Sequence, residues 1–348
     1  MLSLNACIIG LGKMGLLHAG IVNRLDNLHL IAVTEKEKMI RSYFQDLCKN
    51  VVLYDDAETM FRKESLNVAF ITTPISSHYP IAQICIKNHV NFFVEKPLAK
   101  DVKETKKLID MLKSYPEIIH AVGYNRRFID TFAKAKSLLD SNVLGEISSV
   151  RSSMYASNVL SKPTGWRSSK KISGGGVLLD LGSHIVDLLL WYFGPIKRII
   201  SGMIKSVYSA EVEDLAYMNV KFLSGVEGEI NVSWSMPHYR LPELNIEVIG
   251  TNGNLRVNED FVTIYLNGSA SQSTNTTTTI YKQALNRGVS IDLGGPEYTR
   301  EDSHLIECIL KSKQTLNNVY EASRTQSVIQ AMYDAASNNS AEKVEYLS

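Results

Sequence analysis

The first 122 residues alternate short β-branched runs with amphipathic stretches, and this alternation constrains the fold more than any other feature of the chain. The runs with strand character are at 4–9, 28–34, 68–72, 90–94 and 118–122. The helical patterns between them are at 11–24, 78–88 and 102–114. Strands that alternate with helices pair in parallel through helical crossovers. We therefore expect a doubly wound, parallel α/β sheet in this part of the chain.

After Gly123 the pattern changes to long strand-like runs. We expect a helix at 128–139 and a strand at 147–155. Five further runs have strand alternation, at 196–208, 214–222, 226–234, 245–250 and 262–267. Turn signals such as Asn252-Gly253 separate them, as in hairpins. These features predict an α+β domain with a large, mostly antiparallel, open-faced sheet. The expected domains are therefore 1–122 and 123–348, with a polar loop or hairpin at 269–279 and helices at 301–313 and 320–337.

The composition is that of an ordinary soluble protein, with 45% hydrophobic and 21% charged residues and a net charge of +1. Such a balance argues against a nucleic-acid-binding or membrane-surface protein. The four cysteines form no C-x-x-C pair, and two lie in apolar runs, so we expect buried, reduced thiols. No secretory signal precedes the first strand, and a cytoplasmic protein is expected.

A G-x-G-x-x-G motif follows the first strand and opens a helix, which is the context that dinucleotide binding requires. We expect its members Gly10, Gly12, Lys13, Met14 and Gly15 to bind the cofactor. The glycines permit a tight turn, and the helix start offers free N–H groups to a pyrophosphate.

An acidic residue, Glu35, stands 25 residues after Gly10, where it would accept hydrogen bonds from an adenosine ribose. It would repel a 2′-phosphate, so NAD is favoured over NADP, although Lys36 and Lys38 partly offset that preference. The alternative is a glycine turn that binds nothing.

The ends of two later strands carry further candidates for the cofactor pocket. Thr73-Pro74 and His78 follow one strand, and Glu95-Lys96-Pro97 follows the next. Ligands of open α/β sheets bind at the carboxyl ends of the strands. A lysine there can hydrogen-bond a substrate hydroxyl and the cofactor ribose. The alternatives are a solvated turn for Lys96 and a helix start without chemistry for His78.

A glycine-led apolar helix spans 177–191, and its polar members Asp180, His184 and Asp187 share one stripe. Two carboxylates and an imidazole are costly in a mostly buried helix unless they are paired or employed. We interpret the stripe as the wall of an active site, and the preceding Gly174-Gly175-Gly176 as allowing backbone or ligand to approach closely. The alternative is a self-satisfied Asp–His–Asp cluster.

Basic and aromatic residues elsewhere are weaker candidates for substrate contact. Asn125 and Arg126 mark the passage between the domains, where Arg126 and Arg127 either form salt bridges or reach the substrate. Trp166 and Arg167, followed by two lysines, form a small basic group that either binds a phosphate or is a solvated loop. Segments 156–172 and 236–243 are expected to be substrate-facing loops.

Taken in this order, the G-x-G-x-x-G start, the Glu95-Lys96-Pro97 strand end and the glycine-led Asp180–His184–Asp187 helix resemble the Gfo/Idh/MocA oxidoreductase family over essentially the whole chain. The resemblance implies a Rossmann domain and a nicotinamide cofactor, with sugars, inositols or related compounds as substrates. It also implies that Lys96, Asp180 and His184 are catalytic, that Asp187 contacts substrate, and that the C-terminal sheet forms a homodimer or homotetramer.

These features lead to an NAD(P)-dependent dehydrogenase of a sugar, sugar derivative (a nucleotide-linked one included) or inositol. His184 would be the general acid/base, with Lys96 and Asp180 assisting and no metal needed. Two alternatives stay open. One is a reductase of a non-sugar compound, as in the biliverdin reductase and dihydrodiol dehydrogenase branches. The other is a non-catalytic dinucleotide-binding sensor.

Overall fold

The computed structural model describes residues 3–161, 169–208, 211–268 and 274–347. Over these residues the chain forms two compact units, the first within 3–125 and 288–323, and the second within 126–287 and 324–347. The contiguous division into 1–122 and 123–348 is therefore corrected, because 288–323 returns to the first unit. Leu305, Ile306 and Cys308 belong to the same hydrophobic core as Leu4 and Ile8.

The first unit contains a six-stranded sheet in the order β3-β2-β1-β4-β5-β6, and every pair of neighbours is parallel. Its strands are β1 (Leu4–Ile9), β2 (Leu28–Thr34), β3 (Val52–Tyr54), β4 (Val68–Ile71), β5 (Asn91–Val94) and β6 (His120–Val122). This confirms the predicted parallel sheet and adds β3, which the sequence did not indicate. The wholly buried β4 shows why these strands are continuous apolar runs, since both faces of the sheet are covered.

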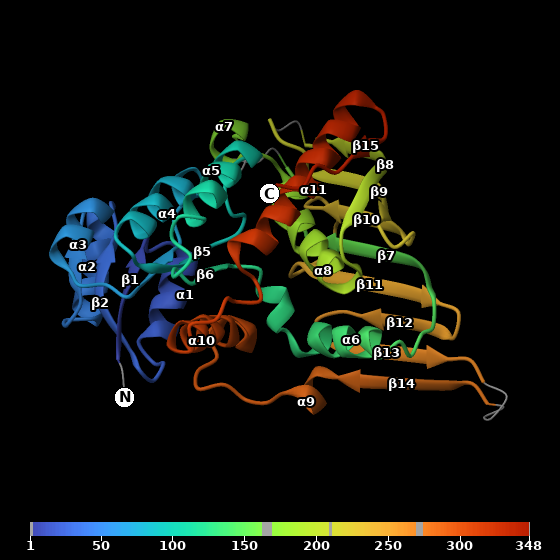
Figure 1. Ribbon diagram of the computed structural model, residues 1–348, viewed down its shortest axis with the longest axis horizontal. Helices are drawn as coiled ribbons and strands as arrows, with labels where there is room; N and C mark the ends of the chain where they lie inside the picture. Colours follow the sequence, from blue (N-terminus) through green and yellow to red (C-terminus); the bar gives the residue numbers. More distant parts are fainter. Residues whose placement is uncertain (1–2, 162–168, 209–210, 269–273, 348) are drawn as a thin grey trace. The chain divides into compact units, whose positions relative to one another are not determined.

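Helices cover this sheet on both sides, with α1 beside α10 and α4 beside α5 (Figure 1). The helices of the unit are α1 (Lys13–Val22), α2 (Lys38–Leu47), α3 (Ala57–Lys63), α4 (His78–Lys87), α5 (Val102–Leu112) and α10 (Pro296–Leu310). Asp56 and Asp101 cap α3 and α5 through side-chain bonds to backbone N–H groups, whereas no side chain caps α1. The first turn of α1 is thus left available to a ligand.

The second unit contains a nine-stranded sheet in the order β14-β13-β12-β11-β7-β10-β9-β8-β15. Its strands are β7 (Ile147–Tyr155), β8 (Ile196–Lys205), β9 (Leu215–Phe222), β10 (Glu227–Ser233), β11 (Glu243–Gly250), β12 (Gly253–Val257), β13 (Phe261–Leu266), β14 (Thr276–Tyr281) and β15 (Glu342–Lys343). β7 and β10 pair in parallel and the other neighbours antiparallel, so the predicted, mostly antiparallel sheet is confirmed. The polar segment expected as a hairpin or loop contains the start of β14.

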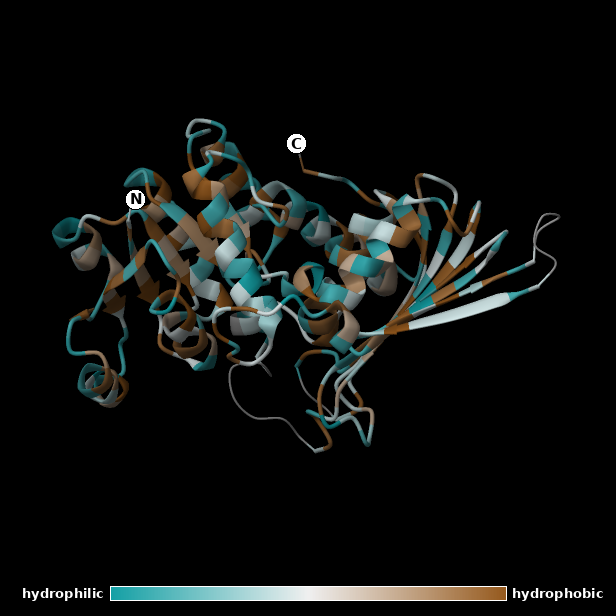
Figure 2. Ribbon diagram, turned by 90° about the horizontal axis from the view of Figure 1, so that it is seen from below, coloured by the Kyte–Doolittle hydropathy of each residue, from teal (hydrophilic) through white to brown (hydrophobic). Residues whose placement is uncertain are grey.

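One face of this sheet packs against helices, as Figure 2 shows within the second unit. The helical elements of this region are η2 (Asn125–Phe128), α6 (Asp130–Asp140), α7 (Lys170–Ser173), the π turn η4 (Leu178–Gly182), α8 (Ser183–Phe193), α9 (Lys282–Leu285) and α11 (Val319–Asn338), which begins in the first unit. α6 lies on β12 and β13, and η4 lies on β10 and β7. The opposite face exposes a cross-strand row of Glu229, Arg151, Glu247 and Arg256.

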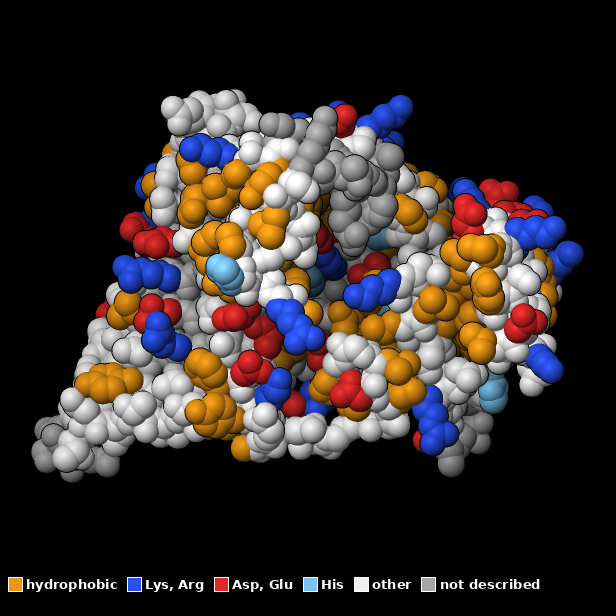
Figure 3. All heavy atoms as spheres, turned by 180° about the vertical axis from the view of Figure 1, so that it is seen from behind, with side chains coloured by type: hydrophobic (Ala, Val, Ile, Leu, Met, Phe, Trp, Pro, Cys, Tyr) orange, Lys and Arg blue, Asp and Glu red, His pale blue; other side chains and the backbone are white. Residues whose placement is uncertain are grey.

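The four cysteines are free thiols, as expected, although Cys48 is half-buried while the other three are buried. In the described ranges, no helix has the length and apolar character needed to cross a membrane. Acidic and basic side chains are intermingled over the face drawn in Figure 3, in line with the balanced charge of the sequence.

Candidate active site

The glycine motif forms a tight turn between β1 and α1. Gly10 has a positive φ of 95°, and its N–H donates to the carbonyl of Thr34 at 2.7 Å. A Cβ on Gly15 would stand 1.9 Å from the carbonyl oxygen of Gly10, whereas a Cβ on Gly12 would have no atom within 4 Å. Gly15 is thus required by the turn itself, and Gly12 faces open space before the uncapped start of α1. This cradle fits a dinucleotide pyrophosphate.

The two glycines make a matched pair of variants. We expect Gly15→Ala to lower the free energy of unfolding by about 1–3 kcal/mol, because the new methyl group overlaps backbone that must shift. Gly12→Ala is expected to change that free energy by under about 0.5 kcal/mol, since its φ of −64° suits alanine. The same methyl fills the approach of a pyrophosphate, so it should weaken NADH binding by at least about tenfold. Urea unfolding and NADH fluorescence titration measure the two effects, and equal destabilisation by both variants would contradict this assignment.

Glu35 lies beside this turn, directly after β2. Its Oε2 accepts the N–H of Leu11 at 2.7 Å, and its Oε1 accepts the N–H of Glu37 at 2.9 Å. Lys36 and Lys38 are exposed. The half-buried carboxylate retains lone pairs that can accept hydrogen bonds from ribose hydroxyls, and its charge opposes a phosphate at the same place.

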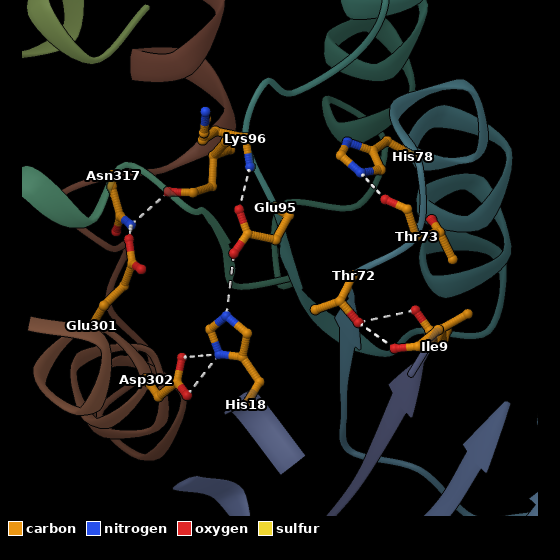
Figure 4. Close-up of polar contacts among 12 residues, drawn as sticks. Ile9, His18, Thr72, Thr73, His78, Glu95, Lys96, Glu301, Asp302 and Asn317 are labelled. Carbon is orange, nitrogen blue, oxygen red and sulfur yellow. Dashed lines mark hydrogen bonds and ion pairs between the residues drawn. The ribbon is translucent and has the colours of Figure 1, made fainter. Parts of the chain in front are cut away.

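The end of β4 packs directly on the glycine turn (Figure 4). The hydroxyl of Thr72 donates to the carbonyl of Gly10 at 2.7 Å, and Thr73 lies against Gly10 as well. His78 is only 2% exposed, with Nδ1 and Nε2 each 2.9 Å from a carbonyl oxygen, of Pro97 and of Thr73 respectively. Burial lowers the pKa of this histidine. His78 therefore joins the β4 and β5 ends from inside the unit, while the exposed Pro74 lies at the surface.

The Glu95-Lys96-Pro97 turn follows β5, next to β4 in the sheet, so it shares the edge at which the glycine turn lies. The Lys96–Pro97 peptide bond is cis. The N–H of Lys96 donates to Oε2 of Glu95 at 3.1 Å, and Lys96 is half-buried. A primary ammonium at this edge can stabilise negative charge that develops on a substrate oxygen.

In the second unit the glycine-led helix begins with a π turn, which the sequence did not predict. Asp180 is half-buried in this turn, and His184 is 7% exposed in the first turn of α8. π turns inside α-helices are frequent at functional sites. Two of the three preceding glycines make room for protein rather than ligand, because a Cβ on Gly175 would meet the hydroxyl of Tyr333 at 2.2 Å and one on Gly176 would meet backbone at 1.9 Å.

Sequence reasoning missed Glu213, which caps the start of this helix. Its Oε1 accepts the N–H groups of Gly176 at 3.0 Å and Leu178 at 3.1 Å, and the hydroxyl of Tyr333 at 2.7 Å. Burial raises the pKa of Glu213, and these hydrogen bonds oppose the rise. A carboxylate that satisfies the free N–H groups of the helix start fixes the turn that carries Asp180.

Asp187 and Arg127 form a buried ion pair. Nε and Nη2 of Arg127 donate to Oδ2 and Oδ1 of Asp187 at 2.9 and 2.7 Å, and the side chains are 2% and 1% exposed. In this structure Asp187 is therefore held by a protein partner, and its contact with substrate stays a prediction. Arg126 likewise pairs with Glu259 at 2.6 Å, and Asn125 is buried. Of the two roles open to the arginines, these pairs favour the salt bridges.

Two further candidates, Trp166 and Arg167, lie outside the described residues. Lys170 and Lys171 start the short helix α7 with exposed side chains. Across the described residues, no group of three or more His, Cys, Asp or Glu side chains is arranged to hold a metal ion.

Comparison with known proteins agrees with this architecture. Residues 4–124 match a family profile described as "Oxidoreductase family, NAD-binding Rossmann fold", and residues 132–256 match the "GFO/IDH/MocA C-terminal domain". The chain is 28% identical over 207 residues to Oxidoreductase P35 of Formosa agariphila, covering 58% of this chain and 64% of that protein, which is less than two thirds of its length. It is 24% identical over 258 residues to scyllo-inositol 2-dehydrogenase (NAD(+)) of Bacillus subtilis, covering 71% and 72%.

A solved structure of levoglucosan dehydrogenase in complex with NADH and L-sorbose superposes with a TM-score of 0.89. That match has 21% sequence identity and covers 99% of this chain and 100% of the other, so it supports the fold. Two profiles of one family thus account for the glycine turn and for the glycine-led helix, and the chain belongs to that family, the Gfo/Idh/MocA oxidoreductases.

Proposed function

We propose that this protein is an NAD-dependent dehydrogenase that oxidises a secondary hydroxyl of a sugar, sugar derivative or inositol, or reduces the corresponding ketone. The observation that carries the proposal is the half-buried Lys96 at the carboxyl edge of the sheet that also carries the glycine cradle. A cation at this edge of the sheet suits a reaction in which an alkoxide develops. The names of the relatives, an inositol and a levoglucosan dehydrogenase, support this substrate class.

The choice of NAD follows from Glu35. Its carboxylate is held beside the glycine turn by two backbone N–H groups, so it cannot easily turn away from a ribose bound there. A 2′-phosphate at that place would meet a fixed negative charge, which Lys36 and Lys38 at the exposed surface only partly compensate.

The proposed roles divide between the two units. When bound, the nicotinamide would supply the hydride chemistry. His184 takes the proton of the substrate hydroxyl, Asp180 orients the imidazole or the hydroxyl, and Lys96 stabilises the oxygen as it becomes negative. In the reductive direction His184 returns the proton.

The test is a titration of the purified protein with NADH and NADPH, followed by a panel of inositols, free sugars, sugar phosphates and nucleotide sugars read at 340 nm. Tighter binding of NADH than NADPH, with turnover of one class of polyol, is the expected result. NADH binding with turnover only of a non-sugar carbonyl would favour the reductase alternative. NADH binding without any turnover would favour a sensor.

We also propose that the open face of the nine-stranded sheet forms a homodimer or homotetramer. The row of Glu229, Arg151, Glu247 and Arg256 alternates in charge, and a two-fold axis could set one row against its copy. Tyr217 and Met203, each 38% exposed and paired across β9 and β8, add apolar area. Light scattering should give an oligomer that Tyr217→Asp weakens, and a wild-type monomer would refute the proposal.

A further inference from the structure

A chain of buried polar side chains runs beneath the Glu95-Lys96-Pro97 turn, within the first unit (Figure 4). Nδ1 of His18 lies 3.0 and 2.9 Å from the two carboxylate oxygens of Asp302, and its Nε2 lies 3.3 Å from Oε1 of Glu95. The other oxygen of Glu95 accepts the N–H of Lys96. The side chains of His18 and Asp302 are 0% exposed. The chain therefore connects α10 and α1 to the residue on which the proposed chemistry depends.

The groups that face His18 favour its protonated form. Asp302 and Tyr298 face it from α10, Glu95 faces it from the end of β5, and the rings of Phe70 and Phe93 cover it from the sheet. Burial acts to lower the pKa of His18, but the two carboxylates outweigh it and raise the pKa to about 10. At neutral pH both ring nitrogens therefore donate, one to each carboxylate. A neutral imidazole has only one N–H and would leave one carboxylate without its partner.

Glu95 has little freedom on its other side. A Cβ on Gly123 would stand 3.0 Å from Oε2 of Glu95 and 3.2 Å from the backbone nitrogen of Lys96, so the glycine backbone closes over the carboxylate. With Oε1 facing His18 and Oε2 holding the Lys96 N–H, the carboxylate has a single orientation to adopt.

We propose that His18 is a positioning residue: held by Asp302, it orients Glu95, and through Glu95 it fixes the backbone from which the Lys96 side chain projects. This inference rests on the proposed role of Lys96. His18 lies on the same helix whose start forms the dinucleotide cradle, so one rigid element sets both the cofactor site and Lys96. No local pattern indicates the contact between His18 and Asp302, since the two residues are 284 positions apart.

Two variants test the proposal, with a matched control. His18→Gln keeps a donor but cannot serve both carboxylates, and Asp302→Asn removes the charge that keeps His18 protonated. The control is His120→Gln: His120 is also buried in this unit, and its Nδ1 accepts the N–H of Val319 at 3.1 Å, with no link to Glu95. Burial lowers the pKa of His120 to about 4, so the control removes a neutral imidazole.

We expect His18→Gln to lower kcat by about 10- to 100-fold, because a small displacement of a reacting group has effects of that size. The NADH affinity of His18→Gln should change by less than about threefold. The control His120→Gln should leave kcat nearly unchanged, even where it lowers the melting temperature as much as His18→Gln does. In Asp302→Asn, kcat should fall with rising pH at a lower pH than in the wild type, in step with the titration of His18 followed by NMR of ¹⁵N-histidine. Equal losses of kcat in His18→Gln and the control would overturn the proposal. The proposal would also be overturned if His18 titrated at a lower pH in Asp302→Asn than in the wild type while the pH dependence of kcat stayed the same.

A readout without turnover separates this inference from the proposed function. In reductively ¹³C-methylated protein, the Lys96 resonance is assigned by its absence in Lys96→Arg. We expect it to shift in His18→Gln or, if that variant does not fold, in Asp302→Asn, and to stay in place in His120→Gln. A shifted resonance in a protein that turns over no polyol would refute the proposed function but retain the positioning role. An unmoved resonance would refute the positioning role whatever the activity.

Discussion

Replacing His184 with glutamine is expected to lower kcat by about 100- to 10,000-fold, the range typical of a lost general base. Glutamine occupies similar volume and can hydrogen-bond, but it cannot take up the proton of a substrate hydroxyl near neutral pH. The residue lies in the first turn of α8, where the Glu213 cap fixes the preceding backbone, so a nearly isosteric change should leave the fold intact.

NADH binding is the companion measurement for this variant. The glycine turn and Glu35 belong to the first unit and His184 to the second, so NADH affinity should stay within a few fold of wild type. His29→Gln, an exposed histidine on β2, serves as the control and should keep full activity. Turnover read at 340 nm that survives His184→Gln would remove His184 from the proposed mechanism. Loss of NADH binding together with turnover would instead indicate that the variant had disturbed the fold.

The parallel sheet was predictable because its strands are buried on both faces and therefore appear as continuous apolar runs. β4 and β1 are of this kind. The strand β3 escaped prediction because it has only three residues, at the edge of the sheet, and Val52 is 48% exposed. β14 resembled a loop for a related reason, since its threonines are exposed and no apolar alternation marks them.

Some parts of the candidate site depend on consecutive residues, and others depend on contacts between residues far apart in the sequence. The glycine turn and the Glu95-Lys96-Pro97 turn are local, because a few consecutive residues determine their shape and their place at a strand end. Partners distant in sequence left no local signal. Asp302 and Glu213 could be recognised only once α10 and the segment before β9 had been placed beside their targets.

The return of 288–323 to the first unit also depends on contacts between residues far apart in the sequence. Its helix α10 has an ordinary amphipathic pattern, which predicts a helix but not the sheet against which it packs. The buried carboxylates of Asp302 and Glu301 indicate that this helix face packs against polar partners, because carboxylates at core positions require them.

The second large effect is expected at the Arg127–Asp187 pair. Asp187→Asn should lower the free energy of unfolding by about 3–5 kcal/mol, because it removes the charge of a bidentate carboxylate from the buried Arg127 guanidinium. The guanidinium of Arg127 also lies 5.8 Å from the centroid of the Trp191 ring, and a cation–π contact is weaker than a buried bidentate ion pair. Urea unfolding with a fixed m-value measures the loss.

The double variant Arg127→Met/Asp187→Leu separates two contributions to the free energy of unfolding: the loss caused by an unpaired buried charge, and the stabilisation that the ion pair itself provides. Since both charges of the pair are removed together, it should be more stable than Asp187→Asn, and the double-mutant cycle should give a coupling energy of about 0.5–3 kcal/mol. The control pair Arg126–Glu259 is more exposed, at 15% and 24%, so Arg126→Met should cost less. If Asp187→Asn proved as mild as Arg126→Met, the buried pair would not hold α8 in place. The substrate contact that the resemblance implies would then be the better account of Asp187.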